Sequence, residues 1–143
     1  MKILYDEKYQ ELLVQQAKAQ ILYFLKNSIE FSIVVNMDSG ITFQPALPEE
    51  ITSGFREFTL FTLAGYTFQS AFVKDNVLVF EAGFGKDNIG TFVHVDIDRI
   101  LQLVIGETPV FINVTASVAK IEKKDSFEIF ASKNKNKKFF KKG

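Results

Sequence analysis

Three side chains in the second half of the sequence have the types and spacing of metal ligands. His94, Asp96 and Asp98 alternate along the chain, and residues two apart on a β-strand lie on the same face. An imidazole and two carboxylates on one face could bind a divalent cation. The alternative is that His94 lies on a solvated strand face while Asp96 caps a helix, and such caps are common. We favour the cap, and we expect no metal site and no other cofactor.

Residues for covalent catalysis are scarce. The chain holds one His and no Cys, and no Ser stands in a G-x-S-x-G turn. The sequence therefore offers few residues that could form a pair of nucleophile and general base. Carboxylate pairs alone are too common to indicate general acid–base chemistry. We expect no catalytic residues and a protein that is not an enzyme.

Three glycines follow one predicted strand. Gly83, Gly85 and Gly90 miss the spacing of a dinucleotide fingerprint. One interpretation is that they let an extended peptide backbone approach closely, since glycine has no side chain. The other is turn geometry at Gly85 and a β-bulge at Gly83.

Composition indicates one domain and a basic tail. A chain of 143 residues suffices for one domain with its own core, and 16 Phe with no Trp indicate a compact β core built on large rings. We place the domain at residues 1–131 and a flexible basic tail at residues 132–143. Residues 1–132 hold 11 basic and 17 acidic side chains, a net charge of −6. The body is thus acidic and the tail basic.

The sequence also favours a cytoplasmic protein. The absence of Cys excludes disulfides and thiolate metal sites. Acidic residues stand close to the N-terminus, which is untypical of a secretory signal. No run approaches the roughly 18 apolar residues that a membrane helix needs, so we expect no membrane partner.

The N-terminal residues predict a helix over residues 6–26. Asp6 is a suitable N-cap, and Glu7 lies in the first turn, where negative charge is favourable. A broad apolar stripe follows, formed by Tyr9, Leu12, Leu13, Ala17, Ile21, Leu22, Phe24 and Leu25. Because this stripe is wider than one small core needs, we expect the helix to form a homodimer interface.

Alternating apolar residues predict about seven short strands after this helix. These are residues 31–35, 41–43, 58–63, 66–73, 77–84, 91–95 and 110–118. We expect the first two to pair with each other and the next three to form a meander. The fold class predicted is mainly β (α+β), with an N-terminal helix followed by a small, strongly bent sheet or partly open barrel with one short helix.

Three local expectations complete this outline. Residues 44–57, with two prolines and a glycine, should form a long loop. Asp96 should cap a short helix over residues 97–105. In the last strand, the apolar residues from Val110 to Val118 should be buried, and the polar residues Asn113 to Ser117 between them should be solvated.

Residues 77–85 read VLVFEAGFG and resemble the strand V-x-F-N-A-x-F-G of the stringent starvation protein B family. The matching residues are Phe80, Ala82, Phe84 and Gly85. Upstream, residues 34–45 resemble the family's V-V-D and G-V-x-V-P segments, and residues 93–103 follow its V-x-V-x-x-x-x-V-L-x-I pattern. The similarity spans about residues 15–105.

This resemblance implies an Sm-like barrel and a non-enzymatic adaptor that hands tagged substrates to the ClpXP protease. An unstructured peptide tag would lie in a groove formed by Val35, Phe43, Phe80, Ala82, Phe84 and Gly85. Family members dimerise and use a C-terminal tail to engage the ATP-dependent unfoldase. Here that docking segment would be Lys137, Lys138, Phe139, Phe140 and Lys141. The family's Asn and second Arg in this strand are Glu81 and Gly83 here, so a different tag is expected.

The tail KNKNKKFFKK has other interpretations. It could be a solvated end without a function, or an arm that binds nucleic acid through its charge and through Phe139 and Phe140. An RNA-binding small barrel is therefore a second hypothesis, and it predicts salt-sensitive affinity. A structural domain that only dimerises through its N-terminal helix is the third.

Overall fold

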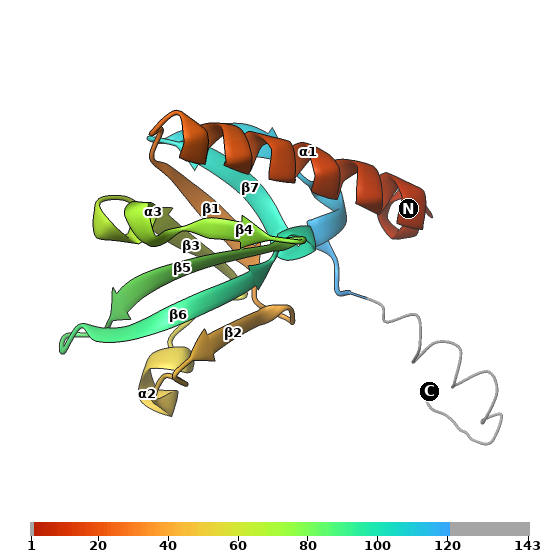
Figure 1. Cartoon of the computed structure of the whole chain (residues 1–143). Coiled ribbons are helices and arrows are strands. Elements are labelled where there is room, and N and C mark those ends of the chain that lie inside the picture. The colour runs from red at the N-terminus through yellow and green to blue at the C-terminus, as the bar shows by residue number, and fades with distance from the viewer. Residues whose placement is uncertain (1, 121–143) are drawn as a thin grey trace, which may run out of the picture.

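The computed structural model describes residues 2–120, which form an N-terminal helix and two four-stranded antiparallel sheets (Figure 1). One sheet has the order β3-β1-β7-β8 and the other β2-β6-β5-β4. The α+β class is as predicted. Both sheets are open at their edges, so these residues form no closed barrel, and two sheets replace the single bent sheet.

The elements have the following bounds. The first sheet contains β1 (Phe31–Asn36), β3 (Phe58–Leu63), β7 (Ile100–Ile105) and β8 (Thr108–Ile112). The second contains β2 (Ile41–Gln44), β4 (Phe72–Lys74), β5 (Val77–Phe84) and β6 (Ile89–Asp96). The α-helices are α1 (Glu7–Lys26), α2 (Glu49–Thr52) and α3 (Tyr66–Ser70), and the 3-10 turns are η1 (Lys2–Tyr5), η2 (Ile97–Arg99) and η3 (Val114–Ser117).

The predicted N-terminal helix is confirmed as α1. The Asp6 carboxylate accepts a hydrogen bond from the Tyr9 N–H at 3.0 Å, as an N-cap should. Five side chains face the core, namely Leu13, Val14, Ala17, Ile21 and Phe24, whereas Leu12, Leu22 and Tyr23 are exposed. The broad stripe therefore covers the core with only part of its width. No helix within residues 2–120 is long and apolar enough to cross a membrane.

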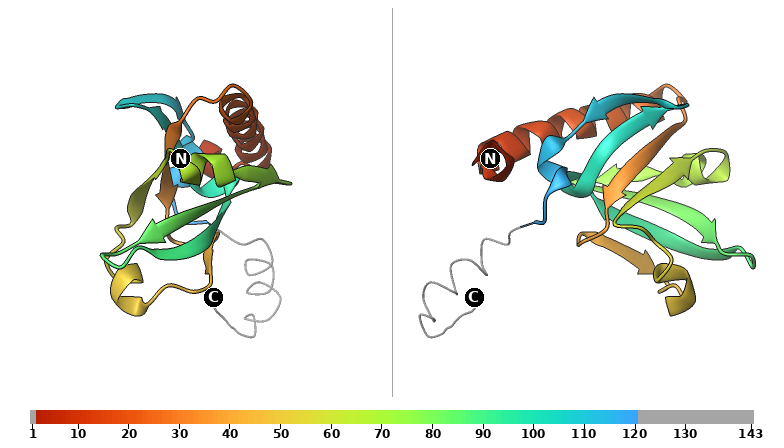
Figure 2. Two further views of the ribbon diagram at one scale, coloured as in Figure 1. Left: turned by 60° about the vertical axis from the view of Figure 1, so that its left-hand side comes forward. Right: turned by 180° about the vertical axis from the view of Figure 1, so that it is seen from behind.

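The core lies between the inner faces of the two sheets, with α1 packed against it. Leu78 and Phe80 of β5 meet Ile33 and Val35 of β1 in one buried cluster. Figure 2 shows the β5–β6 hairpin projecting on the side away from the N-terminus, and α1 contacts η2 between the two sheets.

The strand pairing differs from the expectation in two places. β2 pairs with β6, with Phe43 opposite Val93, so it does not form a hairpin with β1. β1 instead lies between β3 and β7. Five of its six residues are buried, which suits a central strand covered on both faces. The predicted meander of residues 58–63, 66–73 and 77–84 is wrong for its first strand, because β3 belongs to the first sheet. The pairing of β4 with β5 within that meander is confirmed.

Two predicted elements have the wrong type. Residues 66–73 form α3 and the short strand β4, because Gly65 turns the chain with φ +56° and Phe68 packs edge-on against Phe31. Residues 97–105 form η2 and β7 in place of a helix. Asp96 makes no side-chain cap hydrogen bond. β7 is a central strand, and its run of branched apolar residues suits that position.

Residues 110–118 differ from the predicted faces in β8 and at Asn113 and Thr115, whereas Ala116 is buried and Ser117 exposed as predicted. Val110 and Ile112 are 45% and 52% exposed, whereas Asn113 is fully buried. The Asn113 side-chain oxygen accepts hydrogen bonds from the Thr115 N–H and hydroxyl, which offsets the cost of burying polar groups. The predicted long strand therefore ends at Ile112, and η3 follows. The predicted loop at residues 44–57 contains the single turn α2.

Candidate functional site

β5 extends beyond its neighbour β4, which pairs only with Val77 to Val79. Past that point the Glu81 N–H donates to the Ser70 hydroxyl of α3 at 2.9 Å, so it points away from β6. Backbone groups alternate in direction along an antiparallel strand, so the N–H and C=O of Gly83, two residues on, point away from β6 as the Glu81 N–H does. No other described strand pairs with β5 on that side beyond Val79. From Gly83 onward, the end of β5 thus presents backbone groups that a further strand could use, whereas α3 occupies the edge beside Glu81.

A pocket of about 330 Å³ opens at this end of β5, and we call it the edge pocket. Its lining residues are Tyr66, Thr67, Glu81, Ala82, Gly83, Asn88 and Gly90. Gly83 and Gly90 are opposite each other in the β5–β6 register, and the floor is bare backbone at Gly90, while the Asn88 side chain lies over Gly83. A Cβ added at Gly90 would meet nothing within 4 Å, whereas one at Gly83 would collide with the Asn88 side chain.

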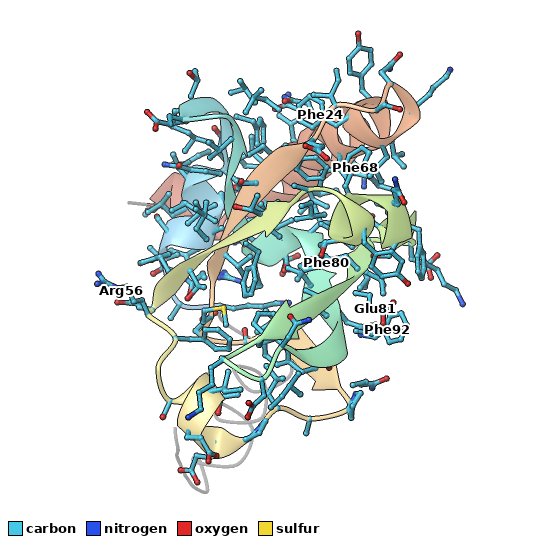
Figure 3. All side chains as sticks on the ribbon, turned by 90° about the vertical axis from the view of Figure 1, so that its left-hand side faces the viewer. Phe24, Arg56, Phe68, Phe80, Glu81 and Phe92 are labelled. Atoms are coloured by element: carbon cyan, nitrogen blue, oxygen red, sulfur yellow. The ribbon has the colours of Figure 1, made fainter. Side chains whose placement is uncertain are left out.

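A carboxylate framed by two aromatic residues lies beside the edge pocket. The Tyr66 hydroxyl donates to Glu81 Oε1 at 2.7 Å, and this bond and the negative charge of Glu81 raise the pKa of Tyr66. Phe92 is directly opposite Glu81 in the register. Tyr66 and Phe92 are 67% and 44% exposed, and Figure 3 shows Glu81 and Phe92 close together at the surface. The Glu81 carboxylate is therefore held in place, and Glu81 is half-buried.

Glu81 has no cationic partner in the described part of the chain. The ion pairs within residues 2–120 join Arg99 or Lys120 to Asp38 or Asp98. Glu81 therefore carries a negative charge that only the Tyr66 hydroxyl contacts directly.

A second pocket, of about 400 Å³, opens near β2 and the segment after α2. Phe43 and Phe55 line it, and their rings stack with centroids 5.7 Å apart and planes 16° apart. Phe84 meets Phe43 edge-on at 5.8 Å and also contacts Phe61. We call these four residues the aromatic cluster. Their mutual contacts join the inner faces of the two sheets, as aromatic pairs in a core do.

The structure separates the six predicted groove residues. Val35 and Phe80 lie in the core, at 0% and 1% exposure, so their side chains have no surface for a ligand. Phe43 and Phe84 belong to the aromatic cluster. Ala82 lines the edge pocket. The shared face of the even-numbered β5 residues is confirmed, but it is the face turned to the core.

The two strand glycines behave differently from each other. Gly85 has φ +75°, a conformation that glycine adopts without strain, so the turn interpretation is confirmed there. Gly83 stays in regular register opposite Gly90, so the predicted bulge is wrong. Three lining residues were missed from the sequence, namely Tyr66, Thr67 and Asn88. Gly83 and Gly90 were among the glycines considered for close approach of a peptide backbone, whereas Tyr66 was assigned to a strand.

The three metal-type residues are spread over different elements. His94 lies within β6, Asp96 ends that strand and Asp98 belongs to η2. Within residues 2–120, no group of three or more His, Asp or Glu side chains is arranged to hold a metal ion. Burial raises the pKa of Asp96, and the charge of Asp98 raises it further.

A second charged region, the Arg99 cluster, consists of Asp38, Asp98, Arg99 and Lys120. The Arg99 side chain is only 3% exposed, and its Nη1 lies 3.6 Å from Asp38 Oδ1. Both terminal nitrogens donate to the Val118 carbonyl, at 3.2 and 3.3 Å. Lys120 Nζ lies 3.0 Å from Asp98 Oδ2. These contacts tie the last described residues to the turn after β1 and to η2.

The predicted docking segment, Lys137 to Lys141, lies outside the described residues. No protein-family model matches this chain, and the comparison with curated proteins gives no match.

Proposed function

We propose that this chain is a non-enzymatic adaptor that binds an extended, unstructured peptide tag and delivers the tagged protein to an ATP-dependent unfoldase such as that of ClpXP. The observation that carries the proposal is the free end of β5 beside the edge pocket. A peptide added as a strand gains main-chain hydrogen bonds for affinity, and pockets for its side chains provide specificity. The sequence resemblance in β5 supports the same proposal.

The glycines of the edge pocket suit such an occupant. Gly90 has no side chain, and the space at its Cβ position is open, so a peptide backbone can approach the floor closely there. The Asn88 side chain lies over Gly83. A volume of about 330 Å³ is at the small end for a ligand pocket, which favours a few side chains of an extended segment over a large cofactor. We further propose a partly open, Sm-like barrel as the fold family, which the antiparallel meander of β4, β5 and β6 supports.

Gly90→Val tests the location of this site. The new side chain enters the edge pocket, and no heavy atom lies within 4 Å of its Cβ position. We expect peptide affinity to fall at least about 10-fold with an unchanged unfolding midpoint, because the blocked pocket loses well over 1 kcal/mol of contacts. Thr108→Val on β8, an exposed strand position in the other sheet, is the matched control.

The measurement is fluorescence anisotropy of labelled nine-residue peptides with the full chain. A scan of N-methylated peptides tests strand addition, because methylation removes one N–H donor at a time. Losses at alternate positions support pairing with β5. Equal tolerance at every position, or full binding by Gly90→Val, would contradict the proposed site.

Delivery needs a separate experiment. A fluorescent protein fused to the bound peptide should be degraded faster by ClpXP when the chain is present, with the largest gain at low substrate concentration. Unchanged degradation would leave a peptide-binding protein without the adaptor role. Salt-sensitive binding of single-stranded RNA in place of peptide would favour the small-barrel RNA-binding alternative.

We also propose that the chain is cytoplasmic and forms a homodimer through α1. The exposed apolar residues Leu12, Leu22 and Tyr23 support this, since the core does not use them. Leu12→Glu should reduce a dimer mass in light scattering without unfolding the protein. Leu13 is unsuitable for this test because it is buried in the core. A monomer mass at tens of micromolar protein would contradict the dimer.

A further inference from the structure

The outer face of the second sheet shows what kind of side chain a bound strand would present there. Glu81 lies on that face beside the edge pocket. Its carboxylate accepts the Tyr66 hydroxyl at 2.7 Å, and it takes part in no ion pair within residues 2–120. A fixed, partly exposed carboxylate without a counter-ion attracts a cationic side chain more strongly than it attracts a neutral one.

The aromatic residues around Glu81 favour the same ligand chemistry. Phe92 is directly across from Glu81 in the β5–β6 register, and opposite Cβ atoms in a sheet lie about 4.5–5.5 Å apart. Phe92 and Tyr66 are both exposed. An aromatic face attracts Lys and Arg side chains through its quadrupole. The long carbon stem of either residue can also cover apolar ring surface.

Strand geometry brings a ligand side chain to this place. A peptide that pairs with the free end of β5 directs alternate side chains to the outer face. Because Ser70 of α3 bonds the Glu81 N–H, the added strand would pair from Gly83 onward, and its side chain opposite Gly83 would be the diagonal neighbour of Glu81. Such neighbours lie about 7 Å apart, which only a long side chain spans. An apolar side chain there would strip water from the carboxylate without replacing its hydrogen bonds, which is costly. An acidic side chain would be repelled.

The charge of the whole body agrees with this local preference. Residues 2–120 hold 9 basic and 14 acidic side chains, a net charge of −5. An acidic surface raises the rate at which basic ligands encounter it.

We propose that the site formed by Glu81, Tyr66 and Phe92 selects a Lys or Arg side chain of an extended peptide that adds to the free end of β5. The inference rests on the proposed peptide-binding function and names its ligand class, a segment of another protein with a basic residue at one fixed position.

The test compares peptides that differ at one position. Nine-residue labelled peptides with an otherwise uncharged sequence carry Lys, norleucine or Glu at each position in turn, and their affinities for the full chain are measured by anisotropy. At one position we expect Lys to bind about 5- to 10-fold more tightly than norleucine, the combined size of a partly exposed ion pair and a cation–π contact.

Variants of the full chain then assign the preference to this carboxylate. Glu81→Gln should reduce the Lys preference to less than about 2-fold, and Glu81→Lys should reverse it toward the Glu peptide. Glu107→Gln, which removes the same charge in the turn between β7 and β8, should leave the preference unchanged. A Lys preference that survives Glu81→Gln would overturn the inference.

Two further outcomes distinguish failure of this inference from failure of the proposed peptide-binding function. If no peptide of the set binds, the proposed function fails. If peptides bind and Gly90→Val abolishes binding, but the Lys and norleucine peptides bind equally, only the proposed selectivity fails.

The basic tail of the chain is the competing occupant of the site. A full-length chain with Lys137→Gln and Lys138→Gln should bind the Lys peptide as the parent does, and a several-fold gain would show that the tail fills the site, which overturns the inference.

Discussion

The Arg99 cluster and the region around Glu81 use charge in opposite ways. Arg99 is buried, and its guanidinium contacts a carbonyl and a carboxylate. Glu81 stands on the surface beside exposed rings, and its one direct partner within the described residues is the Tyr66 hydroxyl. A buried charge must be compensated inside the fold. An exposed charge can be left without a counter-ion at little cost to stability, and it is then free to meet a ligand.

The two regions also differ in what they connect. The Arg99 cluster joins segments far apart in sequence, since Asp38 follows β1 and the Val118 carbonyl precedes the end of the described chain. The Glu81 region joins α3 to the adjacent strand β5. Loss of the first should therefore loosen the fold, whereas loss of the second should alter only recognition.

Arg99→Ala should have the largest effect on stability. It removes two hydrogen bonds to the Val118 carbonyl and the contact with Asp38. We expect the free energy of unfolding to fall by about 2–4 kcal/mol, measured by chemical denaturation. Arg56→Ala, at an exposed position (Figure 3), is the control and should change it by less than about 0.5 kcal/mol. Equal effects of the two variants would show that the Arg99 cluster is not structural.

Asp96→Asn should have a smaller effect of opposite sign. The fold raises the pKa of Asp96 through burial and through Asp98, so the ionised form is less favourable in the folded state than in the unfolded chain. The favourable contribution of Asp96 is present while it is protonated and is lost as the pH rises through its folded-state pKa. At neutral pH the Asn variant should thus be slightly more stable, and the gain should vanish well below the ordinary pKa of 3.8. Chemical denaturation at neutral pH and at a pH well below 3.8 measures the gain in the free energy of unfolding. An equal gain at the two pH values would show that ionisation of Asp96 is not its cause.

Glu81→Gln should leave the unfolding midpoint unchanged, as Glu81 supports little of the fold. It should instead lower the pKa of Tyr66, because the hydrogen bond and the negative charge that raise this pKa both come from Glu81. Titration of the tyrosine ring carbons by NMR measures the change, and Tyr23, exposed on α1, is the internal reference. A Tyr66 pKa equal in both proteins would show that the two groups do not interact in solution.

Local patterns in the sequence were enough to place several elements. The Asp6 cap and the apolar periodicity that follows predicted α1 closely, and the alternation in residues 77–84 predicted β5. These signals involve residues within one or two turns of each other, so the chain carries them without reference to its neighbours.

The same signals did not determine strand partners or the more irregular segments. Alternation in residues 41–43 is satisfied equally by a hairpin with β1 and by the observed pairing with β6. Residues 97–105 contain enough apolar residues for a helix, but a central place between β1 and β8 makes residues 100–105 a strand. Asn113 is buried with its side-chain oxygen bonded to Thr115, and no periodic pattern of apolar residues indicates such a contact.

The candidate site shows the same division. The sequence by itself determined that Phe80, Ala82 and Phe84 share a face and that Glu81 and Gly83 lie on the other, because side chains alternate along any strand. Only the tertiary structure decided that the first face is turned to the core, that β4 is too short to cover the end of β5, and that Tyr66 reaches Glu81 across 15 residues. Such facts depend on where separate elements end and meet in space, and that is set by the packing of the whole chain.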